Sequence, residues 1–325
     1  MDPSVVETIL KYGEPSKYLL YGTAGFRDKH NLPLDYVFVR MGVLAYLRTI
    51  SLTGKSVGAV ITASHNDEID NGIKIVDVDG GMLSRQWEPL AVELANCKVD
   101  DFVAVCNRIV LDLNLHMANN NSTSVVLIGR DTRPHSAGFH ACMKEGVERM
   151  GGHCEDLGEV ITPMLHFTVR DMNQQGYQRR PDHPFQASEW TGRYFHALTS
   201  GYKQLLKTTS NHLEANSRII VDASFGVGSI TLDAFYAHYI SAQGSGEASP
   251  PLSIDVRNAA RTGKVNEDCG AEHAQKLQQP PMGVSAETDL NKLMCSFDGD
   301  GDRIVFHAFM SDPAGKCATF LRYLR

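Results

Sequence analysis

The sequence predicts an α/β fold, and three features point to that class. Short runs rich in β-branched residues alternate along the 325 residues with longer segments of helical periodicity. The residues best suited to chemistry directly follow two of the short runs, as they do at the carboxyl ends of strands in such folds. With 42% hydrophobic residues, the chain can bury the cores that this architecture needs. We therefore expect helices layered on parallel or mixed sheets.

The expected elements follow from these two patterns in chain order. Helical periodicity predicts helices over 35–49, 87–95, 137–150 and 232–239. Short apolar runs predict buried strands over 57–62, 125–128, 218–221, 252–256 and 294–297. A polar, proline-containing segment over 173–188 predicts a linker. We accordingly expect two consecutive α/β domains, 1–172 and 189–309, followed by a tail over 310–325 that carries little pattern.

Composition narrows the possible partners and location. The formal net charge of −7 disfavours a nucleic acid or an anionic membrane as the main partner. The seven cysteines are scattered with no Cys-x-x-Cys pair, so we expect reduced thiols rather than disulfides or a zinc site. The start lacks a signal pattern, and no apolar run approaches the roughly 18 residues of a membrane span. We therefore expect a cytoplasmic protein that binds neither nucleic acid nor membrane.

Three carboxylates follow the last predicted strand at alternate positions. Asp298, Asp300 and Asp302 are separated only by glycines, and such a set of hard oxygen ligands suits Mg²⁺. An EF-hand would need glycine and glutamate at its sixth and twelfth positions, where this chain has Arg303 and Phe309. That calcium loop is excluded. Arg303 instead adds a planar fork that can bind phosphate oxygens, so the loop predicts a magnesium site beside a phosphate.

A hydroxyl nucleophile is the second candidate. Ser64 lies in Thr-Ala-Ser-His-Asn (62–66), directly after a predicted strand, and a tight turn then leads to Lys74. An ordinary nucleotide-binding P-loop at 54–56 is excluded, because that motif requires glycine at the position of Thr49. A metal cage together with a reactive serine predicts phosphoryl transfer, in which positioning and charge neutralisation provide most of the catalysis.

Two further clusters have the composition of anion-binding turns. The segment 21–27 is rich in glycine and ends in Arg27, so backbone N–H groups and a guanidinium could meet a phosphate there. The segment 129–134, Gly-Arg-Asp-Thr-Arg-Pro, follows the predicted strand 125–128. Its charges fit an anion site and a structural ion-pair network equally well.

In sequence, order and approximate spacing, these segments resemble the motifs of the α-D-phosphohexomutase superfamily. The matching motifs are Gly-Thr-Ala-Gly-Phe-Arg (22–27), Thr-Ala-Ser-His-Asn…Asp-Asn-Gly-Ile-Lys (62–74), Gly-Arg-Asp-Thr-Arg-Pro (129–134) and Ser-Phe-Asp-Gly-Asp-Gly-Asp-Arg (296–303). Within the superfamily, the N-acetylglucosamine-phosphate branch is favoured over glucose and mannose mutases by Ala24, Val76-Asp77, Met82-Leu83 and Cys295-Ser296. A phosphoglucomutase or phosphomannomutase is the alternative.

The resemblance implies a Mg²⁺-dependent mutase that interconverts N-acetylglucosamine 6-phosphate and N-acetylglucosamine 1-phosphate, the precursor of UDP-N-acetylglucosamine. A 1,6-bisphosphate of glucose or N-acetylglucosamine would be its activator. The resemblance implies that Ser64 becomes phosphoserine, and that the metal is held by Ser64, Asp298, Asp300 and Asp302. It places around the transferring phosphoryl group Arg27, His65, Lys74 and Arg303, with Thr23, Arg27 and Arg303 binding the phosphosugar. Lys74 is the expected general acid/base.

The sequence also departs from the superfamily pattern. Asp67 stands where proline usually follows the His-Asn pair, which loosens the loop and places a carboxylate near the phosphoserine. Phe225 stands where asparagine is usual. Loops of the third and fourth family domains, of the Glu-x-Asn-Gly-His-Gly and Arg-Pro-Ser-Gly-Thr types, have no counterpart. The resemblance thus implies a catalytically incomplete front half that lacks the C-terminal domains, or a non-catalytic regulatory or binding remnant of the fold.

Overall fold

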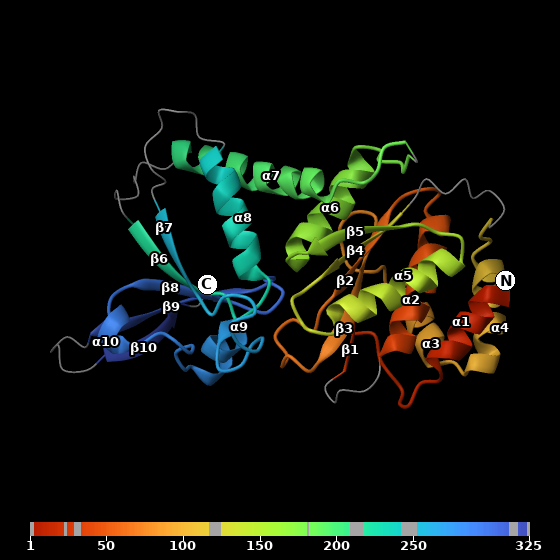
Figure 1. Cartoon of the computed structure of the whole chain (residues 1–325), viewed down its shortest axis with the longest axis horizontal. Coiled ribbons are helices and arrows are strands. Elements are labelled where there is room, and N and C mark those ends of the chain that lie inside the picture. The colour runs from red at the N-terminus through yellow and green to blue at the C-terminus, as the bar shows by residue number, and fades with distance from the viewer. Residues whose placement is uncertain are drawn as a thin grey trace. The chain divides into compact units, whose positions relative to one another are not determined.

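The chain forms two compact units in a computed structural model (Figure 1). The first unit comprises Met1–Ala63, Ile69–Arg130 and Pro134–Ala187, and the second comprises Ser64–Glu68, Asp131–Arg133 and Ser188–Arg325. The structure describes residues 3–22, 25–28, 34–116, 125–180, 182–208, 217–241, 252–311 and 318–323. Two short segments that follow strands of the first unit, 64–68 and 131–133, therefore belong to the second.

The first unit is built on a five-stranded sheet of order β1-β3-β2-β4-β5. Strands β2, β4 and β5 are parallel, and β3 and β1 extend the sheet with antiparallel pairing. The strands are β1 (Phe26–Asp28), β2 (Val57–Ile61), β3 (Asn71–Val76), β4 (Val126–Arg130) and β5 (Cys154–Glu159). The helices are α1 (Pro3–Tyr12), α2 (Asp35–Ser51), α3 (Glu88–Asn96), α4 (Val99–Asp112), α5 (Ser136–Arg149) and α6 (Thr162–Gln174).

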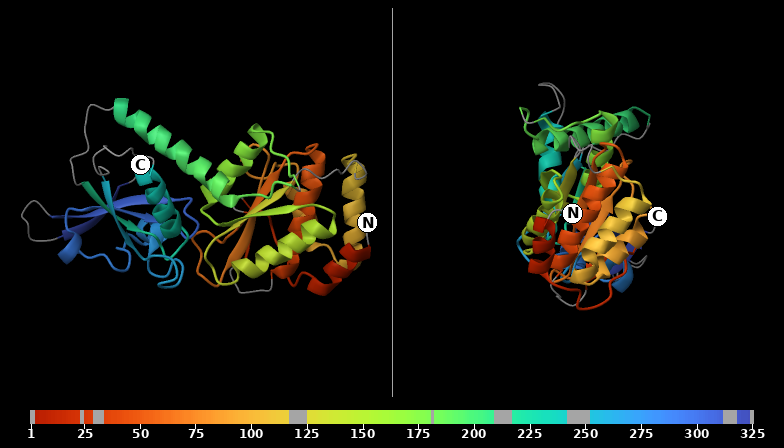
Figure 2. Two further views of the ribbon diagram at one scale, coloured as in Figure 1. Left: turned by 45° about the horizontal axis from the view of Figure 1, so that its top comes forward. Right: turned by 90° about the vertical axis from the view of Figure 1, so that its right-hand side faces the viewer.

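Helices flank this first sheet, and its core lies between the layers (Figure 2). Residues 57, 59 and 61 of β2 join the core that α2 and α5 cover. Gly58 points to the opposite face, where an added Cβ would lie 2.6 Å from Val169 of α6. At the crossing of α2 and α5, a Cβ on Gly146 would lie 2.0 Å from the Val39 carbonyl oxygen. Glycine is therefore what allows these layers to approach so closely.

The second unit contains a five-stranded sheet of order β10-β9-β8-β6-β7. Strands β6, β7 and β8 are parallel, and β9 and β10 pair antiparallel. The strands are β6 (Ser217–Asp222), β7 (Leu252–Arg257), β8 (Leu293–Phe297), β9 (Ile304–Ser311) and β10 (Ala318–Tyr323). The helices are α7 (Ala187–Thr208), α8 (Gly228–Ser241), α9 (Gly270–Glu272), the π-helix η2 (His273–Leu277) and α10 (Ala286–Asp289).

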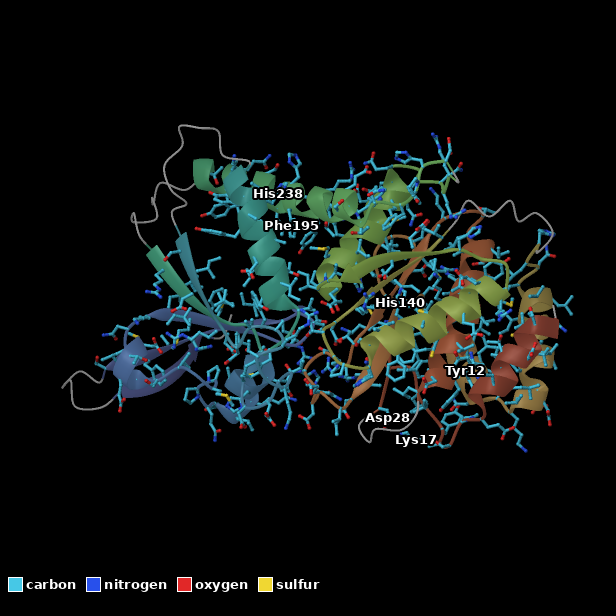
Figure 3. All side chains as sticks on the ribbon, in the orientation of Figure 1. Tyr12, Lys17, Asp28, His140, Phe195 and His238 are labelled. Atoms are coloured by element: carbon cyan, nitrogen blue, oxygen red, sulfur yellow. The ribbon has the colours of Figure 1, made fainter. Side chains whose placement is uncertain are left out.

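Apolar side chains cover both faces of this second sheet. Leu232 of α8 packs on one face against residues 219, 221 and 295. On the other face, Val284 packs against residues 220, 294 and 309. Helix α7 joins this unit through Phe195, whose ring centroid lies 5.8 Å from that of His238 on α8 (Figure 3).

Strands β2 and β8 occupy the same place in their respective sheets. Each is the central strand, with an antiparallel neighbour on one side and a parallel neighbour on the other. Ser64 comes shortly after the end of β2, and Asp298 comes directly after the end of β8. Ligands of open α/β sheets bind at the carboxyl ends of strands where the connections change direction. The topology therefore marks both loops as candidate site loops.

The predicted α/β class with mixed sheets is confirmed, and every predicted helix and strand is present with bounds shifted by a few residues. The expectation for 310–325 needs correction, because this segment supplies strand β10. That strand pairs with β9 from Ala318↔Ser311 to Tyr323↔Phe306. A hairpin partner next to it in sequence provides the hydrogen bonds that order a stretch without apolar pattern.

None of the helices in the described ranges combines the length and apolar character needed to cross a membrane.

Candidate active site

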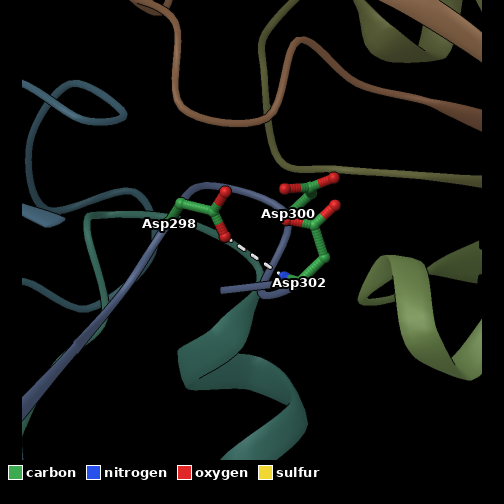
Figure 4. Close-up of side chains that lie close together, drawn as sticks. All are labelled: Asp298, Asp300 and Asp302. Atoms are coloured by element: carbon green, nitrogen blue, oxygen red, sulfur yellow. Dashed lines mark hydrogen bonds between the residues drawn. The ribbon is translucent and has the colours of Figure 1, made fainter. Parts of the chain in front are cut away.

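Three aspartates lie together in the loop that follows β8 (Figure 4). Asp298, Asp300 and Asp302 each offer one carboxylate oxygen, and these oxygens all lie within 4.8 Å of one another. The first two are fully buried and the third is exposed. The backbone N–H groups of Asp302 and Arg303 both donate to Asp298 Oδ1 at 3.1 Å, so the loop folds back around its first carboxylate.

The electrostatics of this loop fit a divalent cation. Burial raises the pKa of the Asp298 carboxyl well above its usual range, and the charges of Asp300 and Asp302 raise it further. Carboxylates this close repel one another, and a positive ion among them would relieve that repulsion. The donor atoms are all oxygens, which are the ligands that Mg²⁺ prefers. The residues present therefore fit a magnesium ion.

Ser64 bonds directly to this loop. Its hydroxyl donates a hydrogen bond to Asp298 Oδ2 over 2.9 Å, and the residue is 2% exposed. Its backbone φ is +54°, in the left-handed region that serine seldom adopts. Gly299 makes the approach possible, because an added Cβ there would lie 2.8 Å from the Ser64 carbonyl oxygen. A strained residue of this kind, held by its surroundings, is typical of active sites.

Two side chains hold the strained turn at Ser64. Arg133 donates to the carbonyl oxygens of Ser64 and Asn66 at 3.2 and 2.6 Å. Asn266 donates through its amide to the same two oxygens at 2.9 and 2.8 Å. Arg133 is fully buried and pairs with Asp131. Segment 129–134 fitted both an anion site and a structural ion-pair network, and Arg133 has the structural role. Asn266 was not identified from the sequence.

Arg303 lies next to the serine. Its Nε is 3.6 Å from Asp298 Oδ2, the same oxygen that accepts the Ser64 hydroxyl. Its Nη1 donates to Glu272 Oε2 at 3.0 Å. The guanidinium therefore connects the candidate nucleophile and metal loop to a further acidic residue.

Glu272 gathers three basic side chains. Besides Arg303, it pairs with Lys276, and His65 Nε2 lies 3.9 Å from its Oε1. Although burial opposes the shift, the hydrogen bond from Lys276 and the charges of His65 and Arg303 lower the pKa of Glu272. Glu272 and Lys276 come from α9 and η2, which match no motif, so sequence reasoning had no signal for them.

A buried carboxylate fixes the backbone segment that carries Glu272. Asp222, at the end of β6, accepts hydrogen bonds from Asn258 Nδ2 at 2.8 Å and from the N–H groups of Ser224 at 3.1 Å and Gly270 at 2.7 Å. Burial raises its pKa, and these hydrogen bonds partly oppose that rise. Asp222 thereby anchors the start of the α9 segment that carries Glu272.

The remaining predicted site residues lie in the first unit or outside the described residues. Arg27 is on β1 and pairs in register with Gly72 of the neighbouring strand β3, which carries the buried Lys74. The adjacent Asp28 forms an ion pair with Lys17 at 2.8 Å (Figure 3). Thr23 lies outside the described residues. The structure thus brings together Ser64, His65, Arg303 and the three aspartates in the second unit, and Arg27 and Lys74 on adjacent strands of the first.

Comparison with known proteins agrees with this arrangement. The sequence model of phosphoglucomutase/phosphomannomutase, alpha/beta/alpha domain I, matches residues 22–95 and 104–177. Phosphoacetylglucosamine mutase of Sus scrofa is 38% identical over 292 residues, which cover 89% of this chain and 49% of the relative. The Homo sapiens protein of the same name is 37% identical over 303 residues, covering 93% and 51%.

Solved structures give the same result. A complex of a serine-to-alanine variant of Aspergillus fumigatus N-acetylphosphoglucosamine mutase with glucose 1,6-bisphosphate has a TM-score of 0.82 at 27% identity, over 98% of this chain and 55% of that one. An N-acetylglucosamine-phosphate mutase in its product complex has a TM-score of 0.81 at 30% identity, over 98% and 55%.

The fold defines the class: it matches that of a solved member of the α-D-phosphohexomutase superfamily. Within that superfamily, its relatives are the phosphoacetylglucosamine mutases, so the resemblance stated from the motifs is confirmed. The chain spans about half the length of the curated relatives that it matches.

Proposed function

We propose that this chain carries the phosphoryl-transfer machinery of a phosphoacetylglucosamine mutase, which interconverts N-acetylglucosamine 6-phosphate and N-acetylglucosamine 1-phosphate. The observation that carries the proposal is the hydrogen bond from the Ser64 hydroxyl to Asp298 in the acidic loop. Related structures support the substrate class, since one contains glucose 1,6-bisphosphate and another N-acetylglucosamine 6-phosphate with magnesium. The product would serve UDP-N-acetylglucosamine synthesis.

In this proposal, Ser64 carries the phosphoryl group between the two sugar positions. Its hydroxyl oxygen forms the new bond to phosphorus while the bond from phosphorus to the sugar oxygen breaks. The sugar oxygen leaves with the bonding electrons and becomes a hydroxyl group, so the proton that the serine loses ends on the sugar. The burial of Ser64 keeps bulk water from competing with the sugar. The 1,6-bisphosphate of glucose or N-acetylglucosamine would load the serine.

Charge neutralisation is the second part of the proposal. The ligands of a magnesium ion would be Ser64, Asp298, Asp300 and Asp302. When bound, the ion supplies positive charge to phosphoryl oxygens. Arg303 provides positive charge from the protein side, because its Nε lies 3.6 Å from the Asp298 oxygen that accepts the Ser64 hydroxyl. His65, the next residue after Ser64, adds a basic side chain to the same loop.

The first unit provides the remaining proposed roles. Arg27 and Thr23 bind the phosphosugar, and Lys74 is the general acid/base; the support for these three roles is their position in the family motifs. We also propose a cytoplasmic location, for which the six described free cysteines are the support.

The test is the phosphorylation of Ser64 by a bisphosphate. Purified chain 1–325 is incubated with glucose 1,6-bisphosphate and MgCl₂, digested, and mapped by mass spectrometry. We expect phosphate on Ser64, and none there in Ser64→Ala. Phosphate on Thr62 or Ser296 with an unmodified Ser64 would overturn the assignment.

The sugar is tested with the loaded protein. Phosphorylated chain is mixed separately with the 6-phosphates of N-acetylglucosamine, glucose and mannose, and loss of phosphate from Ser64 is followed over time. We expect the fastest loss with the N-acetylglucosamine compound. Faster loss with glucose or mannose 6-phosphate would instead favour a phosphoglucomutase or phosphomannomutase.

A further inference from the structure

Glu272 brings together basic side chains at the nucleophile, although it belongs to no motif. Arg303 donates to its Oε2 at 3.0 Å, Lys276 pairs with it, and His65 Nε2 lies 3.9 Å from its Oε1. Through Arg303, this cluster reaches Asp298 Oδ2 at 3.6 Å, the oxygen that the Ser64 hydroxyl contacts. Three basic groups thus converge on one carboxylate, and one of them, Arg303, also contacts the oxygen that accepts the Ser64 hydroxyl.

The backbone presents Glu272 and Lys276 in an uncommon way. Lys276 lies in η2, a π-helix over His273–Leu277. Turns of this kind are rare in proteins overall, and those that occur are often found at functional sites. The segment begins at Gly270, whose N–H donates to the buried Asp222 at 2.7 Å. Glu272 therefore belongs to a segment that is fixed at its start, so the fold sets the position of its carboxylate.

The cluster is also open to a ligand from solution. The side chains of Arg303 and Lys276 are 38% and 67% exposed, and that of Glu272 is 24% exposed. A phosphoryl group carries several anionic oxygens that can take the place of a carboxylate as the partner of such cations. An anion bound there would be repelled by the negative charge of Glu272. Its binding therefore requires the basic side chains to leave the Glu272 carboxylate and contact the anion instead.

We propose that Glu272 is a positioning residue that holds Arg303, His65 and Lys276 together near Ser64 and releases them to the incoming phosphoryl group. Lys276 then serves as a further phosphate-binding cation. This inference rests on the proposed phosphotransferase function and deepens it. It has two separable consequences: Glu272 competes with phosphate for the cations, and it aims Arg303 at the reacting group.

These consequences make Glu272→Gln informative. Loss of the competing charge should tighten binding of inorganic phosphate by about fivefold, the scale of one partly exposed ion pair. Loss of the aiming contact should slow Ser64 phosphorylation at saturating glucose 1,6-bisphosphate by about tenfold. Binding and rate therefore change in opposite senses, whereas a merely structural role would weaken both.

The experiment uses calorimetry with inorganic phosphate and timed mass spectrometry of Ser64 on the full chain. Glu287→Gln is the matched control, because Glu287 is an exposed residue of α10 in the same unit and its loss changes the net charge equally. It should leave both readouts unchanged. Glu272→Asp should restore most of the rate, and Lys276→Ala should weaken phosphate binding by a few fold with little effect on the saturated rate.

The outcomes separate the inference from the proposed function. If wild type is phosphorylated on Ser64 but Glu272→Gln matches it in both readouts, Glu272 is only a surface ion-pair partner and the inference is wrong. Weaker phosphate binding by Glu272→Gln would also overturn it. If wild type is never phosphorylated, the proposed function fails, and the calorimetric comparison of the two proteins still decides whether Glu272 competes with phosphate.

Discussion

The side-chain amide of Asn266 donates a hydrogen bond to the carbonyl oxygen of Ser64 over 2.9 Å. A second bond from the same amide reaches the carbonyl oxygen of Asn66 at 2.8 Å, and the N–H of Asn266 donates to Ser224 O at 3.0 Å. Asn266 thus connects the nucleophile loop, through its side chain, to the loop that follows β6, through its backbone. This contact stabilises a serine whose φ is +54°.

Replacement of Asn266 should therefore slow the phosphorylation of Ser64 more than it lowers the stability of the fold. Asn266→Ala removes two hydrogen bonds of about 1 kcal/mol each and frees Ser64 to leave its strained conformation. We expect about tenfold slower Ser64 phosphorylation in timed mass spectrometry. Asn291→Ala is the control, since Asn291 also has a left-handed φ, +58° against +64° at Asn266. Equal rates in the two variants would show that the amide contacts do not matter.

Removal of one carboxylate from the acidic loop should have opposite effects on metal binding and on stability. Asp300→Asn should weaken Mg²⁺ binding by at least about tenfold, because carboxylate number sets the affinity of such sites. Without metal, the same variant should melt at a higher temperature, since the repulsion that helps to raise the pKa of Asp298 is reduced.

Calorimetry and thermal melts with and without MgCl₂ measure these two effects. Asp233→Asn, an exposed position on α8, is the control and should change neither. Equal Mg²⁺ binding by wild type and a triple alanine variant at 298, 300 and 302 would rule out the metal assignment.

His307 should make the protein less stable in mild acid. Burial lowers the pKa of its imidazole from 6.5 to about 4, and its Nε2 lies 2.9 Å from Ser296 Oγ in the strand that leads into the acidic loop. The folded protein resists protonation that the unfolded chain accepts, so this stability is present above pH 6.5 and is lost as the pH falls toward 4. The full loss is on the order of 3 kcal/mol.

Denaturant unfolding at several pH values from 7 to 4 tests this, with His307→Gln as the comparison. The free energy of unfolding of wild type should fall more steeply than that of the variant across this range. Parallel pH profiles would mean that other groups control the acid sensitivity.

Phe225 should be retained for its packing despite its backbone strain. Its φ is +56°, which favours asparagine over phenylalanine, yet the residue is 7% exposed and its ring lies where a Cβ on Gly263 would come within 2.6 Å. Phe225→Asn would relieve about 1 kcal/mol of strain but lose about 2–3 kcal/mol of ring burial. We expect a net destabilisation of about 1–2 kcal/mol in denaturant unfolding. A more stable variant would show that the strain is the larger effect.

Much of the fold was predictable because its patterns are local. Strand β2 is an unbroken buried run, and α2 is a 17-residue apolar segment that is too long for an ordinary strand, so both were predicted nearly to their ends. Two of the strands that were missed lack such a pattern. Strand β1 has only 3 residues, and β5 is mostly half-buried and polar, so neither has an apolar run that a sequence window could detect.

The chemistry of each site loop is likewise determined by the sequence alone. The alternation of Asp298, Asp300 and Asp302 with glycine places the carboxylates on one short turn, whatever surrounds it. Ser64 was marked by its place after a buried strand. These are statements about neighbours along the chain, which the sequence contains directly.

Only the tertiary structure decided which distant groups meet. Ser64 and Asp298 are 234 residues apart in sequence and share a hydrogen bond. Asn266, Glu272 and Lys276 reach the same loops from segments with no motif. The physical reason is that such contacts depend on where separate strands end and how their loops fold back, and no pattern within any one segment encodes that distance.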